Sequence, residues 1–190
     1  VTINGLDIRD ITQDELRCKI GYVPQKSVLF SGTIDSNIKF GKEDATKEEA
    51  EKAATIAQAM DFINGKEKGF DADISQGGSN VSGGQKQRLS IARAIVRKPE
   101  IYIFDDSFSA LDFKTDVVLR RALSKEIDDS IIFIVAQRIS TIMHAEQIIV
   151  LDEGKVVGIG THSELLKDCE VYQQIASSQL SEKELLASTK

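Results

Sequence analysis

Two short stretches of the sequence carry groups that could bind phosphate and a metal ion. In the first, Ser82-Gly83-Gly84 stands at the start of a basic segment with helix-forming composition. Glycines at a helix start let backbone N–H groups approach an anion, and the helix dipole favours negative charge there. In the second, Asp105-Asp106 ends an apolar run. Carboxylates at the carboxyl end of a parallel strand lie where α/β folds place their ligands, and they can hold Mg²⁺ through its waters.

Each stretch also has an interpretation that involves no ligand. The glycine pair alone could be a flexible turn, and the carboxylate pair alone could be the solvated end of a strand. A third candidate, Gln25, would carry no meaning as an isolated exposed glutamine. The elements that surround these residues must therefore decide between the interpretations.

The apolar runs predict a parallel α/β core. Residues 101–105, 131–136 and 148–151 are short and rich in β-branched or aromatic side chains, which is typical of strands covered on both faces. Residues 113–126 form an amphipathic helix in this interpretation, and its pattern rests on Val117, Val118, Arg120, Arg121 and Leu123. The order strand, helix, strand indicates that the first two strands pair in parallel.

The middle third of the chain has the composition of helices. Ser82 is a good N-cap for a helix that runs to the stop at Pro99. Residues 47–59 are rich in helix formers, and Met60, Phe62 and Ile63 extend an apolar face. The last stretch, residues 181–190, has few apolar side chains and is expected to be a flexible tail.

Composition and charge narrow the class of protein. The 190 residues, 41% hydrophobic and 28% charged, are typical of one globular domain. A formal net charge of −6 disfavours a surface that neutralises phosphate backbones, so we expect no nucleic-acid partner. The run 131–136 is far shorter than the ~18–20 residues that span a membrane, so any membrane connection is expected through a partner. Cys18 and Cys169 lie far apart and predict reduced thiols.

Longer strings around the candidate residues resemble the motifs of one family. Val81-Ser82-Gly83-Gly84-Gln85 with residues 86–94 resembles the signature motif LSGGQxQRxxxARA of ATP-binding-cassette (ABC) proteins. Residues 101–106 followed by 109–112 are similar to the Walker B motif and D-loop of that family. Residues 21–25 resemble its Q-loop, and the resemblance covers residues 1 to about 174.

The resemblance implies an α/β fold, a P-loop-NTPase-like ABC ATPase core with a parallel sheet and a helical subdomain. It implies ATP and Mg²⁺ as cofactors. The site residues it implies are, for nucleotide binding, Gln25, Ser82, Gly83, Gly84, Gln85 and Asp112, for the metal, Asp105 and Gln25, and for catalysis, Asp106 and Gln137.

The resemblance also implies how the domain is divided along the chain. The parts are the core and Q-loop (1–40), the helical subdomain with the signature (about 41–97), the core with Walker B, D-loop and switch position (about 98–165) and the C-terminal helix (about 166–180).

Residues 28–38, 151–155 and 160–165 are similar to the exporter branch of the family. This resemblance implies a location at the cytoplasmic face of a membrane, where transmembrane domains contact the Q-loop region. It also implies a second nucleotide-binding domain as partner, since the family's domains pair head to tail around ATP.

The chain departs from the family at three positions. The catalytic glutamate is replaced by Asp106, whose carboxylate would end about one carbon–carbon bond short of the water that it should polarise. The switch histidine is replaced by Gln137, which can donate a hydrogen bond but cannot carry imidazole proton chemistry. Gln76 stands where exporters often have glutamate. An intact signature beside degenerate catalytic positions resembles one subunit of a heterodimeric, multidrug-type exporter.

No GxxxxGK[ST] motif, the Walker A motif of the family, occurs in the 190 residues. Residues 1–5 look like the family's strand just beyond the Walker A helix, so we expect the chain to begin after this phosphate-binding loop. Without the loop's amides and lysine, the chain alone is expected to bind MgATP weakly or not at all and to be inactive.

Two other classes of protein carry some of the same motifs. Chromosome-maintenance ATPases share the signature but insert long coiled coils, and no such heptad array fits between Gln25 and Ser82. A non-hydrolytic regulatory or translation-associated cassette remains the alternative from a different class, because it would carry the same motifs without a membrane domain.

Overall fold

The computed structural model describes residues 1–127 and 129–181, so the predicted tail lies outside the described residues from 182 on. The chain forms two compact units, Val1–Val135 and Ala136–Lys190. The first contains β1 (Thr2–Ile3), β2 (Leu6–Asp7), α1 (Gln13–Cys18), β3 (Ile20–Val23), β4 (Gly32–Thr33), α2 (Ile34–Lys39), α3 (Lys47–Ile56), α4 (Met60–Asn64), the 3-10 helix η1 (Gly69–Asp71), β5 (Asp73–Ile74), the 3-10 helix η2 (Gln76–Gly78), α5 (Gly83–Val96), β6 (Ile101–Asp105), α6 (Phe113–Glu126) and β7 (Ile131–Val135). The second contains α7 (Ile139–Ile142), β8 (Ile148–Asp152), β9 (Lys155–Gly160), α8 (His162–Asp168) and α9 (Glu170–Gln179).

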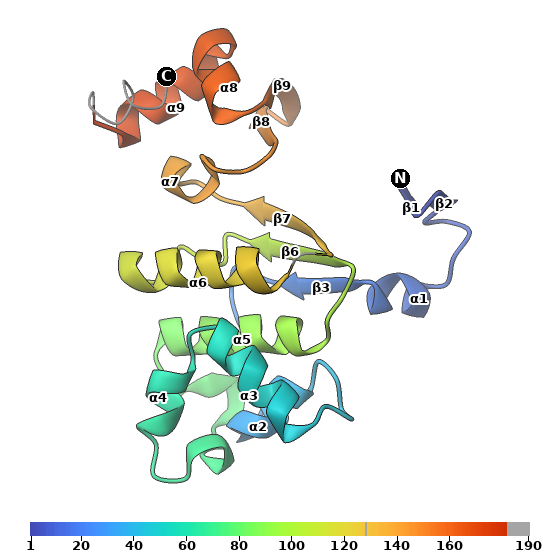
Figure 1. Cartoon of the computed structure of the whole chain (residues 1–190), viewed down its shortest axis with the longest axis vertical. Coiled ribbons are helices and arrows are strands. Elements are labelled where there is room, and N and C mark those ends of the chain that lie inside the picture. The colour runs from blue at the N-terminus through green and yellow to red at the C-terminus, as the bar shows by residue number, and fades with distance from the viewer. Residues whose placement is uncertain (128, 182–190) are drawn as a thin grey trace. The chain divides into compact units, whose positions relative to one another are not determined.

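A parallel sheet with the strand order β3-β6-β7 forms the centre of the first unit (Figure 1). Ile103 of β6 lies between Tyr22 of β3 and Phe133 of β7 in the register. The parallel pairing predicted for residues 101–105 and 131–136 is therefore confirmed, although β7 ends at Val135. Because all three strands run the same way, their carboxyl ends meet at one edge of the sheet.

Helix α5 has a buried stripe made of Gln87, Ser90, Ile91, Ala94 and Ile95, a spacing that places all five side chains on one face. The predicted N-cap, Ser82, is confirmed. The helix packs so closely against β3 that a Cβ on Gly21 would lie 2.8 Å from Pro99 Cγ, just after the helix. Burial of this stripe joins α5 to the sheet.

Figure 1 shows the helices α2, α3 and α4 gathered near α5, which confirms the prediction of a helical middle third. The predicted helix 47–59, however, ends at Ile56. Gln58 adopts φ +57°, a left-handed conformation that cannot continue a right-handed helix, and α4 starts two residues later. The strands β4 and β5 add a small antiparallel pair.

Two strands differ from the prediction that both faces are covered. In β7, Ile131, Phe133 and Val135, which share one face of the strand, are 59%, 52% and 55% exposed. The strand β8 pairs antiparallel with β9. Glu153 and Gly154 join them, both with positive φ (46° and 75°), which is the geometry of a tight hairpin turn. The apolar run over residues 148–151 did not by itself predict this hairpin turn.

The helix predicted over residues 113–126 is observed with those bounds as α6. Its buried residues are Asp116, Leu119 and Leu123, whereas Val118 is 40% exposed. A carboxylate can be buried on this face because Arg120 Nε donates to Asp116 Oδ1 over 2.9 Å.

In the second unit, α8 and α9 pack on the β8–β9 hairpin around a separate apolar cluster formed by Ile139, Ile148, Val150, Leu165, Cys169, Tyr172 and Ala176. Residues 166–180 contain the end of α8 and all of α9. The predicted division at residues 40, 97 and 165 stays a prediction. Among the described residues, no helix is both long and apolar enough to cross a bilayer.

Glu49 should make stability depend on pH. Its carboxylate lies 2.8 Å from Lys98 Nζ and 2.9 Å from Lys42 Nζ. The hydrogen bond from Lys98 and then that from Lys42 lower the pKa of Glu49 from 4.5 to about 2. Because the pKa of Glu49 is lower in the folded chain than in the unfolded chain, the ionised carboxylate stabilises the fold at pH values above the unfolded pKa. This stabilisation is lost as the pH falls from about 4.5 to about 2.

We expect Glu49→Gln to lower the thermal midpoint by a few degrees at pH 7, and the difference from wild type to shrink below pH 4.5. Circular dichroism melts across pH measure this. Glu51→Gln is the matched control, since it removes the same charge from α3 but only a 3.8 Å ion pair with Lys47. Equal losses in both variants would contradict the assignment.

Candidate functional site

The amino end of α5 is closed by a reciprocal pair of hydrogen bonds. Ser82 Oγ accepts from the Gln85 backbone N–H (3.3 Å), and Gln85 Oε1 accepts from the Ser82 N–H (3.0 Å). This capping box satisfies donors at positions 82 and 85 and leaves Gly83 and Gly84 between them at the positive end of a 14-residue helix. The end of α5 is thus built to attract an anion.

The fold of this chain does not itself require glycine at position 83. A Cβ added there would meet nothing within 4 Å, and the backbone is helical. At Gly84 a Cβ would lie 3.4 Å from the Ala110 carbonyl oxygen, an ordinary contact. Since glycine in a helix costs up to about 1 kcal/mol relative to alanine, its use at an open position fits close approach of a ligand to the backbone.

Two predicted residues lie together at the carboxyl edge of the sheet. Gln25 follows β3 and Asp106 follows β6, and Gln25 Nε2 donates to Asp106 Oδ2 over 2.9 Å. Beside them, Tyr22 Oη donates to Asp105 Oδ2 over 2.9 Å, and this hydrogen bond raises the pKa of Tyr22. The sequence analysis did not single out Tyr22, because its role depends on the register between β3 and β6.

Asp106 has an unusual backbone conformation, with φ +44°. Aspartate is among the few non-glycine residues that enter this left-handed region. Its N–H donates to the Val135 carbonyl (2.9 Å), and its carbonyl accepts from Ser109 Oγ (2.8 Å). The turn after β6 is therefore held on both sides, and it leads directly into the D-loop segment, residues 109–112.

The oxygen atoms at this edge suit Mg²⁺. Asp105 and Asp106 supply carboxylates and Gln25 supplies an amide oxygen, the donor types that hard cations prefer. In the described part of the chain, no group of three or more His, Cys, Asp or Glu side chains could hold a metal by itself. Mg²⁺ usually takes one or two carboxylates and completes its shell with waters and substrate phosphates.

Asp112 has a local structural role in this chain. It is the N-cap of α6, where its Oδ1 accepts from the Thr115 N–H (3.0 Å) and its Oδ2 from Thr115 Oγ1 (2.7 Å). The hydrogen bond from the Thr115 side chain lowers the pKa of Asp112. Its assignment to nucleotide binding stays a prediction.

Gln137 lies in the second unit, in the loop after β7, and is exposed. Gln179 of α9 holds this loop: its Nε2 donates to the Gln137 carbonyl (2.8 Å) and its Oε1 accepts from the Ile139 N–H (2.9 Å). The strand that leads to Gln137 ends at Val135, which pairs with Asp105 in the sheet.

Gln87 is a residue that the sequence analysis did not single out. It is only 2% exposed, donates from Nε2 to the Pro24 carbonyl (3.3 Å) and accepts from Ser27 Oγ (2.6 Å). It therefore ties the loop that carries Gln25 to the signature helix. A signal was present in the sequence, since a glutamine on an apolar helical stripe needs buried partners.

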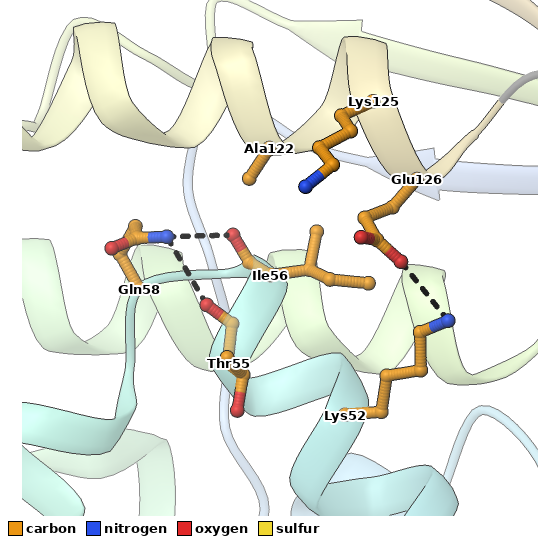
Figure 2. A pocket seen from close by; sticks show the side chains of 7 residues that line it. All are labelled: Lys52, Thr55, Ile56, Gln58, Ala122, Lys125 and Glu126. Atoms are coloured by element: carbon orange, nitrogen blue, oxygen red, sulfur yellow. Dashed lines mark hydrogen bonds and ion pairs between the residues drawn. The ribbon is translucent and has the colours of Figure 1, made fainter.

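A pocket of about 400 Å³ lies between α3 and the end of α6 (Figure 2). It is lined by Lys52, Thr55, Ile56, Gln58, Ala122, Lys125 and Glu126, and Lys52 Nζ pairs with Glu126 Oε2 over 3.0 Å. None of the predicted site residues lines this pocket.

A comparison with protein families matches residues 1–109 to the ABC transporter family. The chain belongs to this family. The matched residues include residues 21–25, 82–85 and 101–106, whose geometry is described above.

Two curated ABC relatives show the extent of the similarity. An uncharacterised ABC transporter ATP-binding protein of Mycobacterium bovis is 45% identical over 182 residues, which are 94% of this chain and 31% of that protein. The ATP-dependent lipid A-core flippase of Desulfotalea psychrophila is 42% identical over 179 residues, 94% of this chain and 31% of the flippase. The chain thus spans about a third of the length of these relatives.

The solved structure of a bacterial Atm1-family ABC exporter with ATP bound superposes with a TM-score of 0.92 at 38% identity. The match covers 95% of this chain and 32% of the exporter chain. The predicted fold class, an ABC ATPase core with a parallel sheet and helices, is confirmed.

We expect Gly83→Ala to leave the fold intact and to raise the free energy of unfolding by up to about 1 kcal/mol, because alanine is the better helix former and the site is open. Urea titration measures this. Gly41→Ala is the contrasting control, since its Cβ would lie 2.0 Å from the Arg93 carbonyl oxygen and must distort the backbone. Destabilisation by Gly83→Ala would show that the fold itself needs this glycine.

Proposed function

We propose that this chain is part of the nucleotide-binding domain of an ABC exporter, which binds MgATP and hydrolyses it to power export across a membrane. The observation that carries the proposal is the hydrogen bond between Gln25 and Asp106, which joins the Q-loop to the residue after the Walker B aspartate. The similar proteins named as a flippase and an exporter support the transport direction. The domain would then lie at the cytoplasmic face of the membrane.

The site residues divide by chemistry. Asp105 and Gln25 would hold Mg²⁺, which neutralises charge on the phosphates when it is bound. The capped amino end of α5 would place the amides of Gly83 and Gly84 against a γ-phosphate. In the capping box, Ser82 and Gln85 orient these amides. Asp112 completes the nucleotide set.

The catalytic positions differ from those of a fully active site. Aspartate at 106 is a methylene shorter than glutamate, and its carboxylate accepts a hydrogen bond from Gln25. Gln137 has no proton to exchange near neutral pH. We infer that the chain supplies a competent signature to a partner's ATP and a poorly hydrolysing site to its own. The partner would be a second, different nucleotide-binding domain.

The surface proposed to meet the transmembrane domains is apolar and exposed. Val28, Phe30 and Phe40 in and beside the Q-loop region are 56%, 41% and 61% exposed. The two phenylalanine rings lie 4.5 Å apart and form one aromatic pair. Exposed aromatic pairs of this kind favour contact with an apolar segment of another chain.

The allocation of the two sites is testable in the full-length protein assembled with its partner. We expect Gly84→Asp to cut steady-state ATPase turnover by about 10²-fold, because a carboxylate there would repel the γ-phosphate in the competent site. Asp106→Ala should cost much less, since it changes the impaired site. Gly84→Ala serves as a steric control, as its Cβ would lie 3.4 Å from the Ala110 carbonyl oxygen and 4.0 Å from Leu111 Cδ2, both ordinary contacts. Equal losses for Gly84→Asp and Asp106→Ala would refute the allocation.

Restoring both catalytic positions should activate the impaired site. We expect Asp106→Glu with Gln137→His to raise its hydrolysis by at least tenfold, a partial recovery of the ~10²–10⁴-fold that general-base catalysis typically contributes. Each single change should do less, because groups that act as a unit are not additive.

The assay uses the assembled heterodimer with the partner's catalytic glutamate disabled, so that background turnover is low. A melt of each variant is the control, since glutamate tolerates φ +44° less well than aspartate. A stable double variant that is no faster than its parent would show that Asp106 and Gln137 do not silence the site.

A further inference from the structure

Arg93, on α5, binds the segment that carries the exposed aromatic pair. Its guanidinium makes three hydrogen bonds to this segment: Nε to the Asn37 carbonyl (2.9 Å), Nη2 to Asn37 Oδ1 (2.9 Å) and Nη1 to the Val28 carbonyl (3.0 Å). The three acceptors belong to two residues, Val28 in the loop before β4 and Asn37 inside α2. The fork therefore ties this loop to α2.

Asn37 extends this contact to Phe30. It is only 2% exposed, and its Oδ1 accepts from the Phe30 N–H while its Nδ2 donates to the Phe30 carbonyl, both over 2.9 Å. The same Nδ2 also donates to the Thr33 carbonyl (2.9 Å). Both backbone polar groups of Phe30 are thus fixed by one buried amide, which is itself bound by Arg93.

The guanidinium also contacts both rings of the aromatic pair. Its central carbon lies 5.1 Å from the centroid of Phe30 and 5.5 Å from that of Phe40. These distances are within the range of cation–π attraction. At the far end, Gly41 approaches the Arg93 carbonyl so closely that no side chain fits between them. Residues 28–41, the 28–41 segment, therefore contact one residue of α5 at several points from Val28 to Gly41.

We propose that Arg93 is a positioning residue, which fixes the exposed Phe30–Phe40 pair to the helix whose other end carries Ser82, Gly83 and Gly84. This inference rests on the proposed function, in which the helix end contacts ATP and the aromatic pair contacts the membrane domain. A displacement of α5 by nucleotide would then move the aromatic pair with it, because the helix and the 28–41 segment behave as one body.

The substitution Arg93→Lys distinguishes a role of Arg93 in positioning the segment from a role in folding. Lysine keeps the positive charge and the helix propensity but has a single point of attachment in place of the planar fork. Arg97→Lys is the matched control on the end of the same helix, because Arg97 donates only to the Arg17 carbonyl (2.9 Å), away from the 28–41 segment.

The experiment uses the full-length protein assembled with its partner in lipid nanodiscs. Three quantities are measured: hydrogen exchange of residues 28–41, affinity for a fluorescent ATP analogue, and the MgATP-dependent change in reactivity of single cysteines placed in the membrane domain. We expect Arg93→Lys to speed exchange in the 28–41 segment and to reduce the MgATP-dependent change about fivefold or more, the lower end of typical coupling. The ATP affinity should stay within about twofold of wild type, and Arg97→Lys should match wild type throughout.

A double-mutant cycle shows whether Arg93 acts through the rings. In a Phe30→Leu, Phe40→Leu background, Arg93→Lys should cause little further loss of the MgATP-dependent change. Should Arg93→Lys fail to fold, Phe40→Leu alone tests the same contact and must itself reduce the change.

Unaltered exchange in the 28–41 segment, or an unaltered MgATP-dependent change despite faster exchange, would overturn the proposal. If the wild-type protein binds no ATP analogue, the proposed function fails. The exchange comparison alone then decides whether Arg93 positions the segment.

Discussion

The buried face of α5 is the constraint on which the first unit depends. Two long polar side chains, Gln87 and Arg93, lie on or beside an otherwise apolar stripe, and neither can be buried without partners. Their partners are carbonyl groups and side chains of residues 24–37. Because α5 can bury these polar groups only when their partners are in place, the packing of α5 and that of residues 24–37 depend on each other.

The arrangement of residues at the carboxyl edge of the sheet depends on a second constraint, the parallel pairing of its strands. The strands β3 and β6 both end at this edge, so Gln25 and Asp106 meet although 81 positions separate them. The tight turn after β6 then requires a left-handed residue, and aspartate tolerates that conformation. The same residue that departs from the family's glutamate is thus compatible with its backbone and already hydrogen-bonded to the Q-loop.

These two constraints place the candidate anion-binding end of α5 and the exposed aromatic pair in the same unit of the chain. The open glycine at 83 and the capping box make the end of α5 suitable for an anion. The other turns of the same helix hold an exposed aromatic pair through Arg93. In the proposed function the domain responds both to nucleotide and to a membrane domain, and a single helix between the two surfaces is a simple physical means of doing so.

The sequence by itself determined the family, the strands β6 and β7, the helices α5 and α6 and the cap at Ser82. These features depend on local order: periodic apolar residues, a capping serine, a stop at proline and motif strings longer than ten residues. The helix break at Gln58 and the β8–β9 hairpin were not predicted, because composition hardly indicates where a non-glycine residue adopts a positive φ.

Only the tertiary structure decided which side chains meet. The pairs Gln25–Asp106, Tyr22–Asp105 and Gln87–Pro24, and the attachment of residues 28–41 to Arg93, join positions more than fifty residues apart. The sequence holds both members of each pair, but their contact depends on strand register and on how closely β3 packs against α5. Register and packing distance are properties of the whole core, because each is set by many side chains at once.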